Sequence, residues 1–294
     1  MLTQEITVPH GGYVTSTFQR VASLHFATTL SAQKQPHTIT LHLDFLRRTQ
    51  VGPATFKVHD VKLGRQTTVI HITLLQAGRE EVVGYLTHAN IATEQGVSFP
   101  VSWTLQPAPL PAQTSLFEAD QDPNWGERKR WPFADFRKAT LHVRSWFPRA
   151  GQPCAGVIDE WLCLRNGENW TNESLGSVVD TFPQVVETLA LPEDPYGVEA
   201  ERREGSGAGE AKAGFWYPTL LLNLDVKKAL PESGVKWLFV RLQAKMIRNG
   251  RFDLEIVVLD EGGDLVALSH HVCFVVGAER NLAARRKKDG ESKL

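Results

Sequence analysis

The sequence predicts an α+β fold made of two tandem copies of a long antiparallel sheet, each wrapped around a central helix. One observation behind this prediction is a pair of apolar helices that lie far apart in the chain. Another is that runs with alternating apolar and polar residues accompany each helix. Because these segments recur in the same order, they indicate a duplicated domain. The 294 residues are enough for two such cores.

The first helix is expected to follow His10-Gly11-Gly12-Tyr13 and to reach about Ala27. Apolar residues recur along it at helical spacing, so we expect one of its faces to be buried. Strand-like alternation follows in four runs, at residues 37–46, 54–63, 66–76 and 81–91. A helix followed by a meander of long strands favours an antiparallel sheet curled around that helix.

Residues 104–135 interrupt this pattern with prolines, followed by acidic and Trp-rich sequence. We interpret them as a connector with some packed aromatic residues. The N-terminal copy is therefore assigned to residues 1–103 and the C-terminal copy to residues 136–282. The remaining residues, 283–294, are expected to form a solvated tail.

The C-terminal copy is expected to contain strands at 139–146 and 157–164, followed by a second apolar helix over 176–189. Asp180 lies in the first turns of that predicted helix, beside its apolar stripe. Residues 199–214 have almost no large apolar side chains, so we expect a mobile loop there.

The duplication can be followed residue by residue. The helix that begins near Gly12 aligns with the one at Gly176, which places Ser16 on Asp180. Other matching segments are Thr17-Phe18 with Thr181-Phe182, 38–44 with 219–225, Gly64-Arg65 with Gly250-Arg251, and 78–88 with 263–271, the last with short gaps. Two copies of one domain are expected to pack as a pseudo-twofold dimer within the chain.

Composition and charge argue against several classes of protein. A formal net charge of −1 does not suit a nucleic-acid surface. The three cysteines favour a reducing compartment over a disulfide framework, and neither they nor the histidines show metal-ligand spacing. We therefore expect no metal and no cofactor. No apolar run has the length of a membrane span, and neither a Gly-x-Ser-x-Gly elbow nor a phosphate-binding loop occurs.

A helix led by Gly-Gly, followed by long strands and the passage from Phe45-Leu46-Arg47 to Gly52-Pro53, resembles the hotdog fold. Two such copies resemble the double-hotdog acyl-CoA thioesterase II family, and most of all the thioesterase-like proteins common in filamentous fungi. The resemblance covers nearly the whole chain. It implies hydrolysis of an acyl thioester, such as an acyl-CoA, to the free acid and the thiol, an activity of lipid metabolism.

The resemblance also implies a site. In the family, an Asp early in the second helix holds the attacking water together with a Thr and a Gln on strands of the second copy. Asp180 matches the Asp, because Val-Val-Asp-Thr-Phe-Pro resembles the family's helix. Thr219 matches the Thr, and His271 stands where the family has Gln. A histidine can orient a water or act as an acid or base, so the family's mechanism does not transfer unchanged.

The residues themselves leave alternatives for each position. Asp180 has Ser16 as its equivalent, so the carboxylate occurs in one copy only, which favours a functional role over simple complementation of a helix dipole. Thr219 suits a strand by β-propensity alone, and His271 could be a hydrogen-bonded core histidine.

Thioester hydrolysis also needs donors for the developing oxyanion. Backbone N–H groups at a helix N-terminus supply them, and glycines let a carbonyl approach closely. Gly11, Gly12 and Tyr13 in the first copy and Gly176 in the second are therefore candidate substrate-binding residues. The alternative is that the glycines only make a tight turn into the helix.

The predicted function is hydrolysis of acyl-CoA or a carrier-bound acyl chain by an Asp-positioned water, in a protein that is a possible homo-oligomer. The alternative is a hotdog protein that binds acyl or polyketide intermediates without hydrolysis, or acts as a dehydratase or isomerase in a biosynthetic pathway. The tripeptide Ser292-Lys293-Leu294 matches a peroxisomal address, so we expect a peroxisomal protein, or otherwise a cytoplasmic one.

Overall fold

The computed structural model describes residues 8–131, 137–182, 184–191, 194–198 and 214–277. In the N-terminal half, the helix and the four strands expected from the sequence are confirmed. They are α1 (Gly11–Ala27), β1 (His37–Phe45), β2 (Thr55–Lys62), β3 (Thr68–Gln76) and β4 (Arg79–Ala89), with the short 3-10 helices η1 (Ser31–Gln33) and η2 (Ile91–Thr93). No helix among the described residues is both long and apolar enough to cross a membrane.

The C-terminal half repeats this plan with additional strands. Its helical segments are η3 (Thr114–Leu116), η4 (Lys138–His142), η5 (Asn172–Ser174), α2 (Leu175–Val178) and α3 (Val185–Ala190). Its strands are β5 (Trp125–Arg128), β6 (Val143–Pro148), β7 (Val157–Leu164), β8 (Phe215–Trp216), β9 (Thr219–Val226), β10 (Leu238–Gln243), β11 (Ile247–Arg248), β12 (Arg251–Leu259), β13 (Leu265–Phe274) and β14 (Val276–Gly277). The predicted connector thus contributes β5, which pairs with β6.

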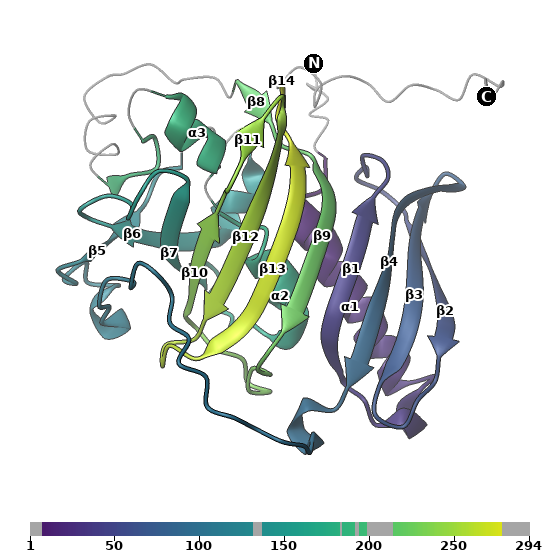
Figure 1. Ribbon diagram of the computed structural model, residues 1–294. Helices are drawn as coiled ribbons and strands as arrows, with labels where there is room; N and C mark the ends of the chain where they lie inside the picture. Colours follow the sequence, from purple (N-terminus) through teal and green to yellow (C-terminus); the bar gives the residue numbers. More distant parts are fainter. Residues whose placement is uncertain (1–7, 132–136, 183, 192–193, 199–213, 278–294) are drawn as a thin grey trace.

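Both halves share one 12-stranded sheet. Its strands follow the order β2-β3-β4-β1-β9-β13-β12-β10-β7-β6-β5, and β11 pairs with β12. In Figure 1 the helices α1 and α2 lie side by side behind the sheet, where they cover its inner face. This arrangement, in which two hotdog units form one continuous sheet over two helices, is the double hotdog predicted from the sequence.

A pseudo-twofold axis relates the halves. Strands β1 and β9 pair antiparallel, with His42 opposite Asn223, and these two residues are also equivalent in the internal repeat. The axis therefore passes between them. The neighbouring pairs obey the same symmetry, because β4 pairs with β1 and β13 pairs with β9, and each pair has an irregularity at the same place, next to Thr38 and next to Thr219.

The two helices cross at glycines. A Cβ atom on Gly12 would lie 2.9 Å from Asp180 Cβ, and one on Gly176 would lie 2.8 Å from the amide nitrogen of Ser16. These contacts are reciprocal, since Gly12 is equivalent to Gly176 and Ser16 to Asp180. A side chain at either glycine would push the helices apart, so both glycines are required for this close crossing.

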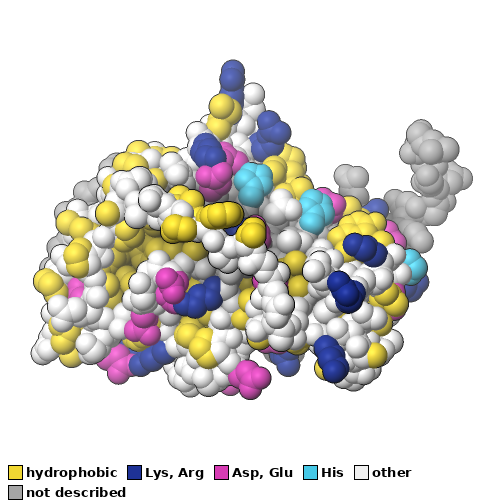
Figure 2. All heavy atoms as spheres, turned by 60° about the horizontal axis from the view of Figure 1, so that its bottom comes forward, with side chains coloured by type: hydrophobic (Ala, Val, Ile, Leu, Met, Phe, Trp, Pro, Cys, Tyr) yellow, Lys and Arg dark blue, Asp and Glu magenta, His cyan; other side chains and the backbone are white. Residues whose placement is uncertain are grey.

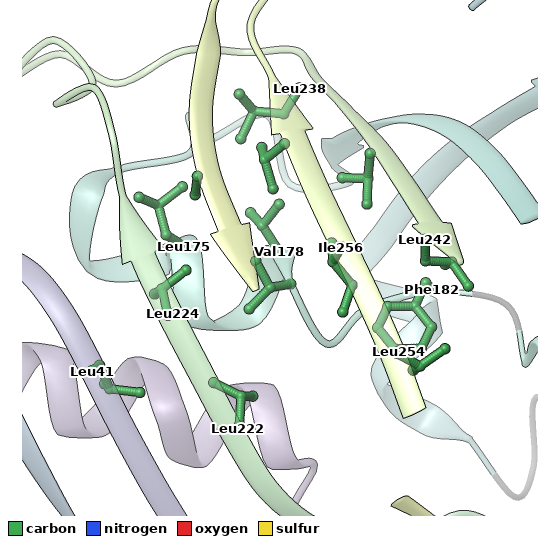
Figure 3. Packing of buried hydrophobic residues seen from close by; sticks show 14 of the residues in the cluster. Leu41, Leu175, Val178, Phe182, Leu222, Leu224, Leu238, Leu242, Leu254 and Ile256 are labelled. Carbon is green, nitrogen blue, oxygen red and sulfur yellow. The ribbon is translucent and has the colours of Figure 1, made fainter. Parts of the chain in front are cut away.

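The core lies between the helices and the inner face of the sheet. Figure 3 shows Leu224 of β9 near Leu175 of α2 and Ile256 of β12 near Val178, whereas Leu222 lies farther along β9, over α1. All five side chains are fully or almost fully buried. Alternation along the strands directs these leucine and isoleucine residues inward, so apolar burial fixes α2 against the second half of the sheet.

The prediction of one helix over residues 176–189 was wrong. Helix α2 ends at Val178, and α3 starts only at Val185. Pro183 lies between them in the sequence. A proline lacks the amide proton that a helix interior needs and disfavours helical geometry in the residue before it, which explains the interruption. Asp180 therefore follows α2 instead of lying inside a long helix.

Two other sequence-based predictions need correction. Residues 138–142 form η4, so the strand expected over 139–146 begins only at Val143. The cross-strand register also pairs His88 with Thr38 and Cys273 with Thr219. Cys273, and not His271, is thus the equivalent of His88. Gaps in the repeat alignment had shifted this match by two positions, which sequence similarity alone does not reveal.

The predicted loop at 199–214, apart from its last residue, and the tail lie outside the described residues.

The segment between η2 and the connector exposes apolar side chains. Val97, Phe99 and Val101 are 79–88% exposed. Viewed from the lower edge of the sheet, hydrophobic side chains gather mainly over the half that contains the C-terminal strands, while the histidine side chains in view lie over the middle and the other half (Figure 2). The connector passes across the lower end of the sheet in Figure 1, on the side away from the helices.

Candidate functional site

Asp180 lies where the two halves meet. It directly follows α2 of the second copy, and its side chain, only 10% exposed, faces the N-terminus of α1 in the first copy. The helix crossing described above brings it there. A carboxylate so little exposed needs polar neighbours, because an unpaired buried charge is costly.

Two histidines flank this carboxylate, one on each oxygen. His10 Nδ1 lies 3.5 Å from Asp180 Oδ2, and His271 Nδ1 lies 3.7 Å from Asp180 Oδ1. They come from different halves, since His10 precedes α1 and His271 belongs to β13. They also differ in access, because the His10 side chain is 34% exposed and that of His271 is 0% exposed.

The hydrogen bonds around His271 determine its neutral tautomer. Ser269 Oγ donates to the Asn223 carbonyl oxygen at 2.5 Å, so its lone pairs are left to accept from His271 Nε2 at 3.0 Å. The proton of neutral His271 is therefore on Nε2, and Nδ1 presents a lone pair to Asp180. Among the described residues this Nδ1 has no hydrogen-bond partner. Burial lowers the pKa of His271 to about 4, although the carboxylate opposes that shift.

Thr219 and Gly11 complete the surroundings of the carboxylate. A Cβ atom on Gly11 would lie 2.7 Å from Asp180 Oδ2 and 3.8 Å from Thr219 Oγ1, so both oxygens face the space that Gly11 leaves open. Cys273 Sγ donates to Thr219 Oγ1 at 3.8 Å, and burial raises the pKa of this thiol to about 12. Because the thiol keeps its proton, the Thr219 hydroxyl is free to donate its own.

The first turn of α1 presents backbone donors beside this space. The first hydrogen bond within the helix runs from Val14 N–H to the His10 carbonyl oxygen at 3.1 Å. The amides of Gly11, Gly12 and Tyr13 thus have no acceptor in the helix itself. The Gly12 amide donates instead to His10 Nδ1 at 3.2 Å, which makes His10 the N-cap of α1.

A cavity of about 610 Å³ opens onto these groups. Its wall includes His10, Gly11, Asp180 and Thr219. The apolar part of the lining consists of Val8, Pro9, Val14, Phe45, Leu46, Ala139, Phe182, Trp216, Pro218 and Leu220, and the basic part of Arg47, Arg48, Arg137 and Lys138. An apolar pocket with a few polar groups at one point is typical of a small-molecule site.

A buried ionic cluster braces one wall of the cavity. Glu187 of α3 accepts hydrogen bonds from the Arg137 guanidinium, from the Tyr196 hydroxyl and, at 3.1 Å, from the Tyr217 hydroxyl. Burial raises the pKa of both tyrosines, so they remain donors. Because Tyr217 is two residues before Thr219, this cluster holds the start of β9 in place.

The structure brings together some of the residues expected from the sequence. Gly11, Asp180 and Thr219 line the cavity, and His271 lies directly behind Asp180. Three other candidates do not line it. They are Gly12, Tyr13 and Gly176. The Gly12 amide donates to His10 Nδ1, and the Tyr13 side chain is 67% exposed. Gly176 is buried in the helix crossing, and its amide donates to Gln19 at 2.8 Å. Within the described part of the chain, no group of three or more His, Cys, Asp or Glu residues is arranged to hold a metal ion.

His10 is the site residue that sequence reasoning missed. Its position directly before Gly11-Gly12, at the start of an apolar helix, is the signal that could have singled it out. Histidine is an uncommon N-cap, since Ser, Thr, Asp and Asn are preferred there. Its distance to Asp180, however, depends on the crossing of two helices from different halves.

Comparisons with known proteins agree with this architecture. Residues 3–89 match the acyl-CoA thioesterase N-terminal domain, and residues 107–275 match the acyl-CoA thioesterase C-terminal domain. The thioesterase-like protein TwmA of Talaromyces wortmannii is 38% identical over an alignment 316 residues long, which covers 97% of this chain and 88% of that protein.

Solved structures show the same fold at low identity. A protein with a hot dog fold from Alicyclobacillus acidocaldarius has a TM-score of 0.66 at 14% identity, over 92% of this chain and 88% of that one. The acyl-CoA thioesterase II TesB2 of Mycobacterium marinum has a TM-score of 0.51 at 15% identity, over 90% and 91% of the two chains. The family resemblance expected from the sequence is confirmed: the chain belongs to the acyl-CoA thioesterase family and has its double-hotdog fold.

Proposed function

We propose that the protein hydrolyses an acyl thioester at Asp180 and that acyl-CoA is its substrate class. The observation that carries the proposal is the position of the Asp180 carboxylate, which faces both a cavity and the open first turn of a helix. A base or orienting carboxylate and nearby oxyanion donors are what thioester hydrolysis requires.

The proposed reaction begins with a water held between Asp180 and Thr219 next to Gly11. The water oxygen attacks the thioester carbonyl carbon while one water proton passes to the group formed by the Asp180 carboxylate and the two histidines beside it. The carbonyl oxygen becomes an oxyanion near the amides of the first turn of α1, where the helix dipole also favours negative charge. The tetrahedral intermediate then expels the thiolate, which takes up a proton to leave as the thiol.

The rest of the cavity supports a long substrate with an anionic carrier. Its volume lies within the range of roughly 300–1,000 Å³ that is usual for ligand sites. Apolar side chains provide a surface for an acyl chain, and the basic residues Arg47, Arg48 and Lys138 also line the cavity. Guanidinium and ammonium groups suit the phosphates of coenzyme A.

The test is thiol release from a panel of acyl-CoAs of increasing chain length, with Asp180→Asn beside the wild type. We expect turnover by the wild type and a decrease in kcat of at least about a hundredfold in the variant. Ser16→Ala, at the equivalent position of the first copy, is the matched control and should keep wild-type turnover. Equal turnover by Asp180→Asn would refute the site.

Absence of thiol release from every substrate would favour the non-hydrolytic alternative, a hotdog protein that binds or dehydrates an acyl intermediate. His271 keeps this alternative open, because it replaces a neutral amide with a titratable ring beside Asp180. Binding of the same acyl-CoAs without turnover would then be measured by calorimetry.

We also propose import into peroxisomes through Ser292-Lys293-Leu294, which lies outside the described residues. A fluorescent protein fused to the N-terminus should co-localise with a peroxisomal marker, and removal of Leu294 should abolish that co-localisation. An unchanged location after this deletion would contradict the proposal.

A further inference from the structure

We propose that His10 is a catalytic proton acceptor whose protonation releases the Gly12 amide for the oxyanion. The proposal rests on the proposed function and deepens it, because it couples the basic group and the oxyanion donor of the same site. The geometry behind it is the shared use of one atom, His10 Nδ1, by Gly12 and Asp180.

The neutral form of His10 is defined by its hydrogen bond. Nδ1 accepts from the Gly12 amide at 3.2 Å, so in this form the ring proton is on Nε2 and Nδ1 carries a lone pair. Asp180 Oδ2 lies 3.5 Å from the same Nδ1, a distance at which two acceptors do not bond each other. A proton must arrive before His10 and Asp180 can pair.

Protonation of Nδ1 reverses these relations. A protonated ring nitrogen has no lone pair, so it cannot accept from Gly12, and it becomes a donor directed to Asp180 Oδ2. The carboxylate stabilises the imidazolium, as a buried carboxylate does for a histidine base in other hydrolases. The Gly12 amide loses its acceptor at the same moment and is left as a free donor at the N-terminus of α1.

The coupling fits the order of events in thioester hydrolysis. As the water oxygen forms its bond to the carbonyl carbon, one water O–H bond breaks and its proton goes to His10 Nδ1. The electron pair of the carbonyl π bond moves to the oxygen, which the released Gly12 amide then stabilises. When the carbonyl re-forms, the C–S bond breaks with its electron pair on sulfur, and the Nδ1 proton passes to the thiolate. The products are the acid and the thiol, and His10 and Gly12 return to their first state.

A role as the N-cap of α1 alone would not require a histidine at position 10, nor a side chain that is exposed to the cavity. The His10 side chain lines the cavity and is 34% exposed, so a bound thioester can reach it. At the equivalent point of the second copy, Ser174 before α2 makes no side-chain cap hydrogen bond. The histidine of the first copy and the carboxylate of the second therefore meet at one of the two equivalent ends of the helix crossing, beside the cavity.

The test compares two substitutions that separate capping from proton transfer. In His10→Asn the amide oxygen of the new side chain keeps the Gly12 N–H occupied, whereas in His10→Ala that N–H is always free. Neither variant can accept the proton, so we expect kcat to fall about a hundredfold in His10→Ala with KM nearly unchanged. We expect a further loss of roughly tenfold in His10→Asn, because an oxyanion donor is blocked.

A purely structural role predicts the opposite order, with the capping variant His10→Asn more active than His10→Ala. That order, or a kcat near the wild-type value in His10→Asn, would overturn the proposal. His25→Asn is the matched control, since it removes a histidine that contacts Asp60 at 2.8 Å away from the cavity. It should leave kcat unchanged.

A second readout does not depend on turnover. In ¹H–¹⁵N NMR spectra of the wild-type protein, the Gly12 amide resonance should shift with the same midpoint as the His10 ring when pH is varied. A Gly12 resonance that ignores the His10 titration would refute the coupling even if no thioester is hydrolysed. Conversely, an active wild type with an inactive Asp180→Asn variant and a fully active His10→Asn variant would leave the proposed function standing and remove only this inference.

Discussion

Asp180 and Ser16 occupy equivalent positions at the two ends of one helix crossing, yet their surroundings differ. Beside Asp180, Gly11 has no side chain, and a cavity reaches the carboxylate. Beside Ser16, the residue equivalent to Gly11 is Leu175, which is completely buried. The Ser16 hydroxyl is itself bonded to Ser177 at 2.8 Å. The same backbone arrangement is therefore open at one end and filled at the other.

The two fully buried histidines, His88 of β4 and His271 of β13, also differ, although they are not equivalent positions of the repeat. In the first copy, His88 Nδ1 donates to the Gln35 carbonyl oxygen at 3.2 Å, and Nε2 of the neutral ring accepts from Thr38 Oγ1 at 2.9 Å. The ring also stacks on Phe26, with ring centroids 4.0 Å apart. In the second copy, His271 leaves Nδ1 without a hydrogen bond to any described residue and directs it to Asp180. A satisfied polar group stabilises a core, whereas an unsatisfied one beside a carboxylate is available for chemistry.

Duplication thus provides two places with the same geometry, and the amino acids decide which one is a site. A missing side chain at Gly11 and an added carboxylate at Asp180 distinguish the open end. The second helix start is also closed, because Gln19 accepts from the Gly176 amide at 2.8 Å. Both copies contribute residues to the open end, whereas the equivalent closed end contributes packing.

The largest expected effect comes from adding a side chain at Gly11 and removing one at the equivalent residue, Leu175. Gly11→Ala should lower kcat by about a hundredfold or more, because its Cβ would lie 2.7 Å from Asp180 Oδ2. Leu175→Ala should instead leave kcat unchanged and lower the free energy of unfolding by about 2–5 kcal/mol, since it opens a cavity in the core. Steady-state kinetics and urea unfolding of both variants measure this. Loss of activity in Leu175→Ala at full folding would contradict the distinction.

Acid sensitivity should come from both buried histidines. Burial lowers the pKa of His88 and of His271 from 6.5 to about 4, so between these values the unfolded chain binds more protons than the folded one. The free energy of unfolding should therefore fall as pH drops from about 6.5 to about 4, by up to about 1.4 kcal/mol per pH unit for each histidine. His88→Gln and His271→Gln should each reduce that slope in urea titrations at several pH values. An unchanged slope in both variants would refute the assignment.

A carboxylate placed in the closed end should not create a second site. Ser16→Asp would put a charge beside the buried Leu175 and would lose the hydrogen bond to Ser177. We expect a loss of about 1–3 kcal/mol in unfolding free energy and no added turnover in an Asp180→Asn background. Recovered thiol release in the double variant would show that the closed end has the capacity for catalysis.

The smallest effect is expected on the pseudo-twofold axis itself. His42 Nδ1 and Asn223 Oδ1 are 2.7 Å apart on the outer face of the sheet, where both side chains are partly exposed. A double-mutant cycle with His42→Ala and Asn223→Ala should give a coupling of about 1 kcal/mol or less and no change in kcat. A coupling of several kcal/mol would mean that the halves depend on this contact more than on their shared core.

Much of the fold followed from the sequence because its signals are local. The alternation at residues 37–46 and the helical spacing after Gly12 each predict an element without reference to the rest of the chain. The repeat then indicated that Asp180 has no carboxylate counterpart in the other copy, where Ser16 stands. The resemblance to a family added Thr219 and His271, and the structure places both near Asp180.

Other features depended on contacts between distant segments. The repeat suggested Gly176 as a substrate-binding glycine, but in the structure it packs against α1 at the helix crossing. His10 resembled an ordinary residue before a helix until the crossing placed it 3.5 Å from Asp180. Periodicity and repetition are properties of the chain alone, whereas the distance between side chains of α1, α2, β9 and β13 is set by how closely two glycines let the helices approach and by where the strand registers shift. The duplication can therefore be detected from the sequence alone. Which end of the helix crossing is open is determined only when the two copies pack against each other.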